Sequence, residues 1–153
     1  SGLYVWNSGQ GPDLVSPMEE TAAATFNEDG SRLYAVDSGL QRIVEFDAAS
    51  GTSDFALFPE DARVDAAGLA VSAGSRYLLL ADRASRIVRV YETGSHTLAA
   101  TLPLDVEPSR LERLSSEAVF VVNGSRADEW LVILDARETP RTYFVPASAG
   151  EQL

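Results

Sequence analysis

Residues 27–51 read NEDGSRLYAVDSGLQRIVEFDAASG, and this stretch decides the predicted fold. Two short and mostly apolar runs, residues 32–36 and 43–46, are bounded by Gly, Ser, Asp and Asn. Aromatic and β-branched side chains fit the pleated surface of a strand, whereas Gly, Asp and Asn accept the backbone angles of turns. The stretch therefore predicts two antiparallel strands joined by a short turn.

The same pattern returns further along the chain. Residues 74–95 read GSRYLLLADRASRIVRVYETGS, and the Gly-Ser-Arg and Arg-Ile-Val triplets recur at a fixed offset of 44 residues. A weaker third copy has AVFVVN at residues 118–123 and WLVILD at residues 130–135. Short strands repeating every ~40–50 residues are the signature of a β-propeller, in which each repeat forms a four-stranded antiparallel blade.

Four strands per copy give predicted repeats at residues 22–58, 67–104 and 109–146. The segment 107–117 also fits a short helix, but the repeat favours an irregular innermost strand there. Residues 3–19 supply at most two strands, as a partial blade that either completes the third copy or forms the outer half of a fourth.

The predicted fold class is all-β and propeller-like, with about three to three and a half four-stranded antiparallel blades. Propellers typically close a ring of about four to eight blades. We therefore expect residues 1–153 to form a single propeller-type domain or fragment, which is either a partial propeller or half of a dimeric ring.

These stretches resemble the YVTN and NHL families of propeller repeats. The sequence NEDGSRLYAVDSG followed by RIVEFDAASG resembles the YVTN pattern of turn, strand, polar loop, strand and turn. Asp37 with Arg42, and Asp82 with Arg86, resemble the NHL repeat, in which an Asp ending one strand faces an Arg opening the next. The resemblance covers residues 22–146 and implies fold more than function, because these families include binding scaffolds, sensors and lactonases. It transfers no catalytic residue.

Composition excludes several classes of site. The 153 residues include 23 acids, 12 Arg, no Lys, no Cys and one His, for a net charge of −11. This charge opposes nucleic acid and anionic lipid as partners, and the lack of Cys excludes disulfides and thiolate metal sites. A single His excludes a two-His metal site within one chain. We therefore expect no cofactor, no metal and no nucleic-acid partner.

No apolar run approaches the ~18 residues of a membrane helix, so we expect no membrane insertion. The first 20 residues lack a charged region followed by an apolar one. A signal peptide can be removed from a mature chain, and we favour a secreted or periplasmic location.

The candidate ligand- or partner-binding residues lie in turns and at strand ends. Trp130 is the preferred exposed aromatic, because it follows a longer loop that also contains Arg126 and Asp128. Asp37 and Asp82 occupy a repeated hairpin position, where they either brace the turn or face a ligand at the mouth of the ring.

Other polar residues favour structural roles. His96 lies in a Gly-Ser-His-Thr turn and is expected to be a solvent-exposed turn residue. Arg63, Arg110 and Arg113 either form an anion-binding surface or belong to a solvated face compensated by neighbouring acids.

The preferred function is a non-catalytic propeller module that binds a protein partner or neighbouring domain within a larger extracytoplasmic protein. A homodimer is one form of such a partner. The alternatives are a lactonase-like propeller hydrolase, whose catalytic groups would converge near the axis, and a purely structural repeat segment.

Overall fold

The computed structural model describes residues 2–6, 12–47, 49–59, 63–115, 118–125 and 131–145. Almost all regular structure in them is β-strand. The strands are β1 (Gly2–Trp6), β2 (Pro12–Pro17), β3 (Thr21–Phe26), β4 (Arg32–Asp37), β5 (Arg42–Asp47), β6 (Gly51–Leu57), β7 (Ala66–Val71), β8 (Tyr77–Asp82), β9 (Ile87–Glu92), β10 (Thr97–Pro103), β11 (Pro108–Ser115), β12 (Val119–Gly124), β13 (Leu131–Asp135) and β14 (Arg141–Val145). A single 3₁₀ turn, Ala73–Ser75, is the helical part, and no helix among the described residues is long and apolar enough to cross a membrane.

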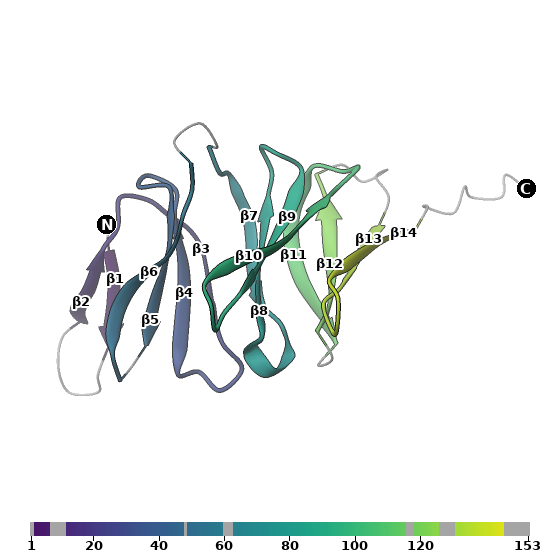
Figure 1. Ribbon diagram of the computed structural model, residues 1–153. Helices are drawn as coiled ribbons and strands as arrows, with labels where there is room; N and C mark the ends of the chain where they lie inside the picture. The colour runs from purple at the N-terminus through teal and green to yellow at the C-terminus, as the bar shows by residue number, and fades with distance from the viewer. Residues whose placement is uncertain are drawn as a thin grey trace, which may run out of the picture.

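These strands form three four-stranded antiparallel sheets, β3–β6, β7–β10 and β11–β14 (Figure 1). Strands that follow one another in the chain are neighbours in each sheet, because short turns join antiparallel strands. β1 and β2 pair as a separate two-stranded hairpin. The predicted all-β fold of a partial propeller is confirmed.

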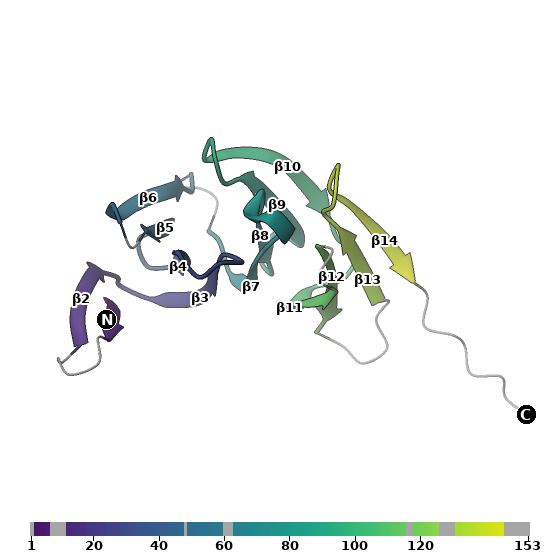
Figure 2. The same ribbon diagram turned by 90° about the horizontal axis from the view of Figure 1, so that it is seen from below.

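The three sheets fan around a shared centre to form an open arc (Figure 2). β3, β7 and β11 lie along its concave side, and β7 contacts both of the others. The contact between β7 and β11 is close enough to require glycine at one position. A Cβ atom on Gly68 would lie 2.9 Å from both the Cβ and the backbone nitrogen of Leu111.

The middle sheet is buried on both faces. Successive side chains of β8 point to opposite sides, because the side-chain period of a strand is two. Leu78 and Leu80 join the core shared with the first sheet, whereas Leu79 and Ala81 join the core shared with the third. Two apolar cores therefore hold three sheets together, and the middle sheet contributes to both.

The spacing between structurally equivalent residues differs by one from the spacing between identical residues in the sequence. Asp37 is opposite Arg42 in the first sheet, and Asp82 is opposite Ile87 in the second, so equivalent positions are 45 residues apart. Arg86 lies in the turn, where its φ of 52° matches the φ of 49° at Gln41. The predicted offset of 44 was therefore wrong for the first two sheets, since it aligned side chains that point to opposite faces.

The predictions for the two less regular segments have different outcomes. Pro108–Ser115 forms the strand β11 with two register shifts, so the irregular strand is confirmed over the short helix. The third sheet has four strands of its own, and the β1–β2 hairpin lies at the opposite end of the arc, beside β6. The hairpin therefore does not complete the third copy, and its position fits the outer half of a preceding blade.

Candidate functional site

The Asp37 side chain ties the end of β4 to the segment that enters the first sheet. Its fully buried carboxylate accepts hydrogen bonds from the backbone amides of Glu19 and Glu20, both at 3.1 Å, and of Leu40 at 3.2 Å. Arg42 Nε lies 3.8 Å from Asp37 Oδ2. Burial alone would raise the pKa of the Asp37 carboxyl, but the three amide hydrogen bonds and Arg42 hold that pKa below its ordinary value.

Asp82 repeats this arrangement in the second sheet. Its buried carboxylate accepts hydrogen bonds from the backbone amides of Asp65 and Ala84, both at 3.2 Å. Its charged partner is Arg89, from the adjacent strand β9, and not Arg86 as the repeat predicted. These contacts support the interpretation of Asp37 and Asp82 as structural braces. Trp130, Asp128 and Arg126 lie outside the described residues, and their binding role stays a prediction.

A polar cluster around the buried Glu45 connects the first two sheets, and it was not predicted from the sequence. Glu45 is almost fully buried, and its carboxylate lies 3.0 Å from Arg32 Nη1 and 3.0 Å from His96 Nε2. Tyr34 Oη donates to the same carboxylate at 3.4 Å. Burial and the Glu45 charge raise the pKa of the Tyr34 hydroxyl. One feature of the sequence could have revealed this cluster. Glu45 follows Ile43 by two residues, so it lies on the same, core-facing side of β5.

His96 reaches across from the turn between β9 and β10. Its ring packs on Phe55 with a centroid distance of 4.6 Å, while its Nε2 atom contacts Glu45. His96 is an exposed turn residue, as predicted, and its side chain in addition bridges two sheets.

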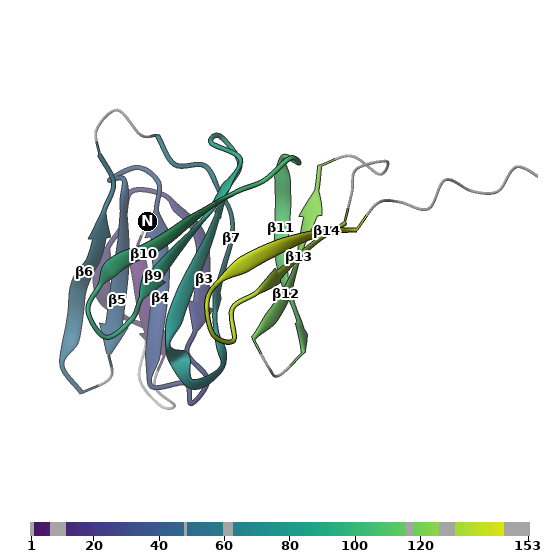
Figure 3. The ribbon, with the colours of Figure 1, turned by 45° about the vertical axis from the view of Figure 1, so that its right-hand side comes forward.

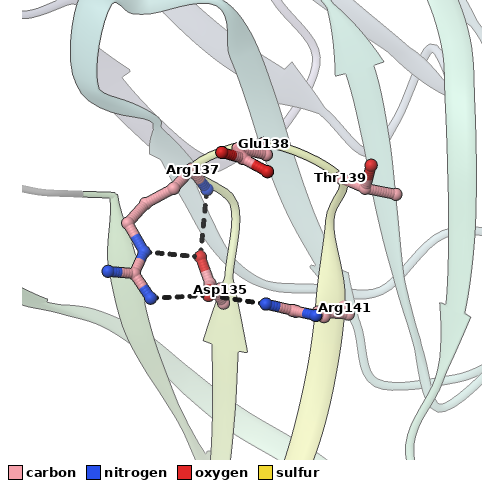
Figure 4. A pocket seen from close by; sticks show the side chains of 5 residues that line it. All are labelled: Asp135, Arg137, Glu138, Thr139 and Arg141. Carbon is pink, nitrogen blue, oxygen red and sulfur yellow. Dashed lines mark hydrogen bonds and ion pairs between the residues drawn. The ribbon is translucent and has the colours of Figure 1, made fainter.

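A polar hollow of about 300 Å³ lies on the third sheet, at the turn between β13 and β14 (Figure 4). Asp135 lies in this hollow between two arginines. Arg137 donates to Asp135 through Nε at 3.0 Å and through Nη2 at 2.9 Å, and Arg141 Nη2 lies 3.8 Å away. The Arg137 hydrogen bonds lower the pKa of Asp135 to about 2. The arginines are thus matched by this carboxylate.

Two other hollows lie between the first and second sheets. One, of about 560 Å³, is lined by Asn27, Glu28, Asp29, Ser31, Arg32, Gly74 and Ser75, and the other, of about 370 Å³, includes Arg63. Arg110 pairs with Glu112 at 2.9 Å, and Arg113 donates to the Val71 carbonyl. The Glu112 contact favours the compensated interpretation for Arg110, and Arg113 is held by a backbone carbonyl. Within the described part of the chain, no group of three or more His, Asp or Glu is placed to hold a metal ion.

The most distinctive surface is the outward side of the third sheet. Phe120, Val122, Val132 and Leu134 point into the core shared with the middle sheet. The alternate residues Val121, Ile133 and Tyr143 are directly opposite one another and point outward, as do the paired residues Leu131 and Val145. We call these five outward residues the end face.

The end face is apolar and exposed. Leu131, Tyr143 and Val145 are 41%, 45% and 44% exposed, and no described strand lies beyond this sheet (Figure 3). The outer side of the first sheet is different, because Ala35 and Val44 there are at most 1% exposed and the β1–β2 hairpin lies at that end. Contiguous exposed apolar residues on a sheet mark an interaction surface. The end face is therefore the candidate functional site.

Comparison with known proteins identifies the architecture. No protein-family model matches the chain, and no curated protein sequence does. Solved β-propeller structures do match. Virginiamycin B lyase from Staphylococcus aureus has a TM-score of 0.72 at 10% identity over 96% of this chain and 49% of its own. The β-propeller domain of Swd1 from Myceliophteria thermophila has a TM-score of 0.61 at 15% identity, over 86% of this chain and 41% of its own.

The WD40 repeats of RRP9 match with a TM-score of 0.62 at 13% identity, over 87% of this chain and 41% of the RRP9 chain. The chain therefore spans half or less of the length of these three propellers. At these identities the likeness shows the fold alone, and the fold is that of a β-propeller module.

Proposed function

We propose that the chain is a non-catalytic propeller module that binds a protein partner or neighbouring domain through its end face. The observation that carries this proposal is the exposure of Leu131, Tyr143 and Val145 on one sheet face. Inside the chain, faces of the same kind are covered by the next sheet, and burying apolar surface contributes about 25 cal/mol per Å². A partner that covers the end face would gain the same contribution.

The hydrolase alternative has less support. The strands that lie on the concave side include β3 and β7, with sequences TAAATF and AAGLAV. In these two strands, small and mostly apolar side chains occupy the positions where a hydrolase would place acids and bases near the axis. The third concave strand, β11, does carry charged residues, Arg110, Glu112 and Arg113. The purified chain should hydrolyse no member of a lactone panel above the buffer rate. Hydrolysis that disappears on Asp37→Asn or Asp82→Asn would favour the enzyme.

We also propose that the repeats belong to the YVTN or NHL type and that residues 1–153 form one domain or a fragment of one. Asp37 and Arg42 lie directly opposite each other on neighbouring strands of the first sheet, which supports the NHL-like pairing. In the second sheet Asp82 instead pairs with Arg89, which departs from that pattern. Arg126, Asp128 and Trp130 precede β13 in the sequence, which makes them candidates for the rim of the same interface.

Photo-crosslinking tests the interaction surface directly. A photoreactive benzoylphenylalanine replaces Tyr143 in one variant and Leu98 in a matched control, because Leu98 is also half exposed and lies on the outermost strand of its sheet. Illumination of the cells that make the protein should give one discrete adduct from position 143 and none from position 98. Equal adducts at both positions, or none at position 143, would overturn the proposal.

A further inference from the structure

The β1–β2 hairpin has the pairing pattern of the last two strands of a complete sheet. Its ladder has one register shift, just before Tyr4, and the ladder between β5 and β6 has one just before Val44, 40 residues further on. The other pairs of the two ladders correspond at the same spacing. Met18 follows β2 and Phe58 follows β6, and both are buried. β1 and β2 are therefore equivalent to the third and fourth strands of a four-stranded unit.

One edge of β1 has no neighbour. In each complete sheet the third strand lies between the second and the fourth, as β5 lies between β4 and β6. Among the described residues β1 pairs with β2 alone. Its other edge therefore presents backbone N–H and C=O groups that are free to pair with an added strand. The second strands β4, β8 and β12 already have a strand on each side, so none of them is available for this position.

This edge also lacks two of the features with which proteins protect a free sheet edge. Charged residues and proline on an edge strand discourage pairing with another chain. Each outermost strand carries at least one of them, such as Pro12 in β2, Asp54 in β6, Pro103 in β10 and Arg141 in β14. Residues 2–6 read GLYVW, without a charge and without proline. β1 is therefore an unprotected edge.

We infer that the open edge of β1 accepts an extended, apolar strand of a partner polypeptide, antiparallel to β1. This site lies at the other end of the arc from the end face and does not depend on the proposed function. In this mode of binding, main-chain hydrogen bonds supply affinity and alternate side chains supply specificity.

The complete sheets indicate which sequence fits. The second strands of the first two sheets read RLYAVD and YLLLAD, and their mostly apolar middle residues are opposite the third strand. Because β1 is uncharged, we expect its partner strand to resemble the second of these, with an apolar middle and polar ends. A second copy of the chain has its own second strands already paired on both sides. We therefore expect the strand to come from a different polypeptide.

A peptide of residues 74–83, GSRYLLLADR, contains β8 and tests the inference. Fluorescence polarisation of the labelled peptide should show saturable binding to the purified chain. Only alternate amides of a strand point toward one neighbour, so N-methylation of Leu78 and Leu80 and N-methylation of Leu79 and Ala81 should differ. One of these two peptides should bind at least about tenfold more weakly, and the other should change by less than about twofold. Absence of binding, or equal effects of the two modifications, would overturn the inference.

Photo-crosslinking locates the bound peptide. Benzoylphenylalanine in place of Tyr4 should capture the peptide, whereas in place of Leu98 it should not, although Leu98 is also half exposed and lies on an outermost strand. Circular dichroism should show that both variants fold. Equal capture at the two positions would contradict a site on β1. An adduct of two chains at position 4 without peptide would make a second copy the occupant and would also overturn the inference. Neither result affects capture at Tyr143, which tests the proposed function separately.

Discussion

Arg42 contacts two aspartates in very different surroundings. Its Nη1 atom lies 2.8 Å from the half-exposed Asp54, and its Nε atom lies 3.8 Å from the fully buried Asp37. Asp37 also accepts three backbone amides, and an Asn side chain would turn an NH₂ group toward some of them. A buried donor that loses its acceptor is costly, whereas an exposed ion pair contributes little.

We predict that Asp37→Asn lowers the free energy of unfolding by about 2–3 kcal/mol. The matched variant Asp54→Asn, which faces the same arginine, should cost less than about 1 kcal/mol. Urea denaturation at neutral pH measures both. Equal effects at the two positions would show that Arg42, and not the amide hydrogen bonds, makes Asp37 important.

The lowered pKa of the Asp135 carboxyl should make the stability of the folded chain depend on pH. Its pKa of about 2 in the folded chain lies below the ordinary value of 3.8, so folding favours the ionised form. This contribution is fully present above pH 4 and is lost as the pH falls toward 2. Because Arg137 is half exposed, solvent screening reduces the contribution to about 1 kcal/mol.

Asp135→Asn should therefore lower the free energy of unfolding by about 1 kcal/mol at pH 7, and by much less near pH 2. The difference between the two proteins, measured by denaturation across this range, isolates Asp135 from the other carboxyls. A difference that stays constant with pH would contradict the proposed Arg137 interaction.

The innermost strands set how closely neighbouring sheets approach. A Cβ on Gly68 of β7 would meet both the side chain and the backbone of Leu111 on β11 at 2.9 Å. We predict that Gly68→Ala forces these strands apart and costs about 1–3 kcal/mol. Gly94→Ala is the control, because nothing lies within 4 Å of its added Cβ, and it should change stability by less than about 0.5 kcal/mol. Thermal unfolding of the two variants distinguishes a close strand contact from a general effect of replacing glycine.

At the scale of the element, the alternation of apolar and polar residues was a sufficient guide to most strands. β11 shows its limit, because Leu111 and Leu114 also fit a helix, and the position in the repeat decided for a strand. Hydrogen bonding then fixed the register. Shifting a strand by one residue exchanges its two faces, and identical letters 44 residues apart did not reveal that the sheets repeat every 45.

The arc as a whole behaves as a row of sheets in which each contacts only its neighbours. Leu79 and Leu80 are adjacent and both fully buried, yet they belong to the cores shared with the third and first sheets respectively. Leu79→Ala should therefore speed hydrogen exchange more in β11–β14, and Leu80→Ala more in β3–β6, with each costing about 2–5 kcal/mol. Exchange that rises equally in both outer sheets for either variant would show a single cooperative unit.

The sequence by itself determined an all-β chain of repeated four-stranded units. This is because the alternation of side chains along a strand and the preferences of turn residues depend only on residues that are close in the sequence. Only the tertiary structure decided that Asp82 pairs with Arg89, that His96 reaches Glu45 in the neighbouring sheet, and that Leu131, Tyr143 and Val145 stay exposed. Each of these depends on how strands and sheets pack, because a long side chain pairs with whichever partner the packing brings within reach. Local sequence patterns carry no information on the distance between side chains of different strands or sheets.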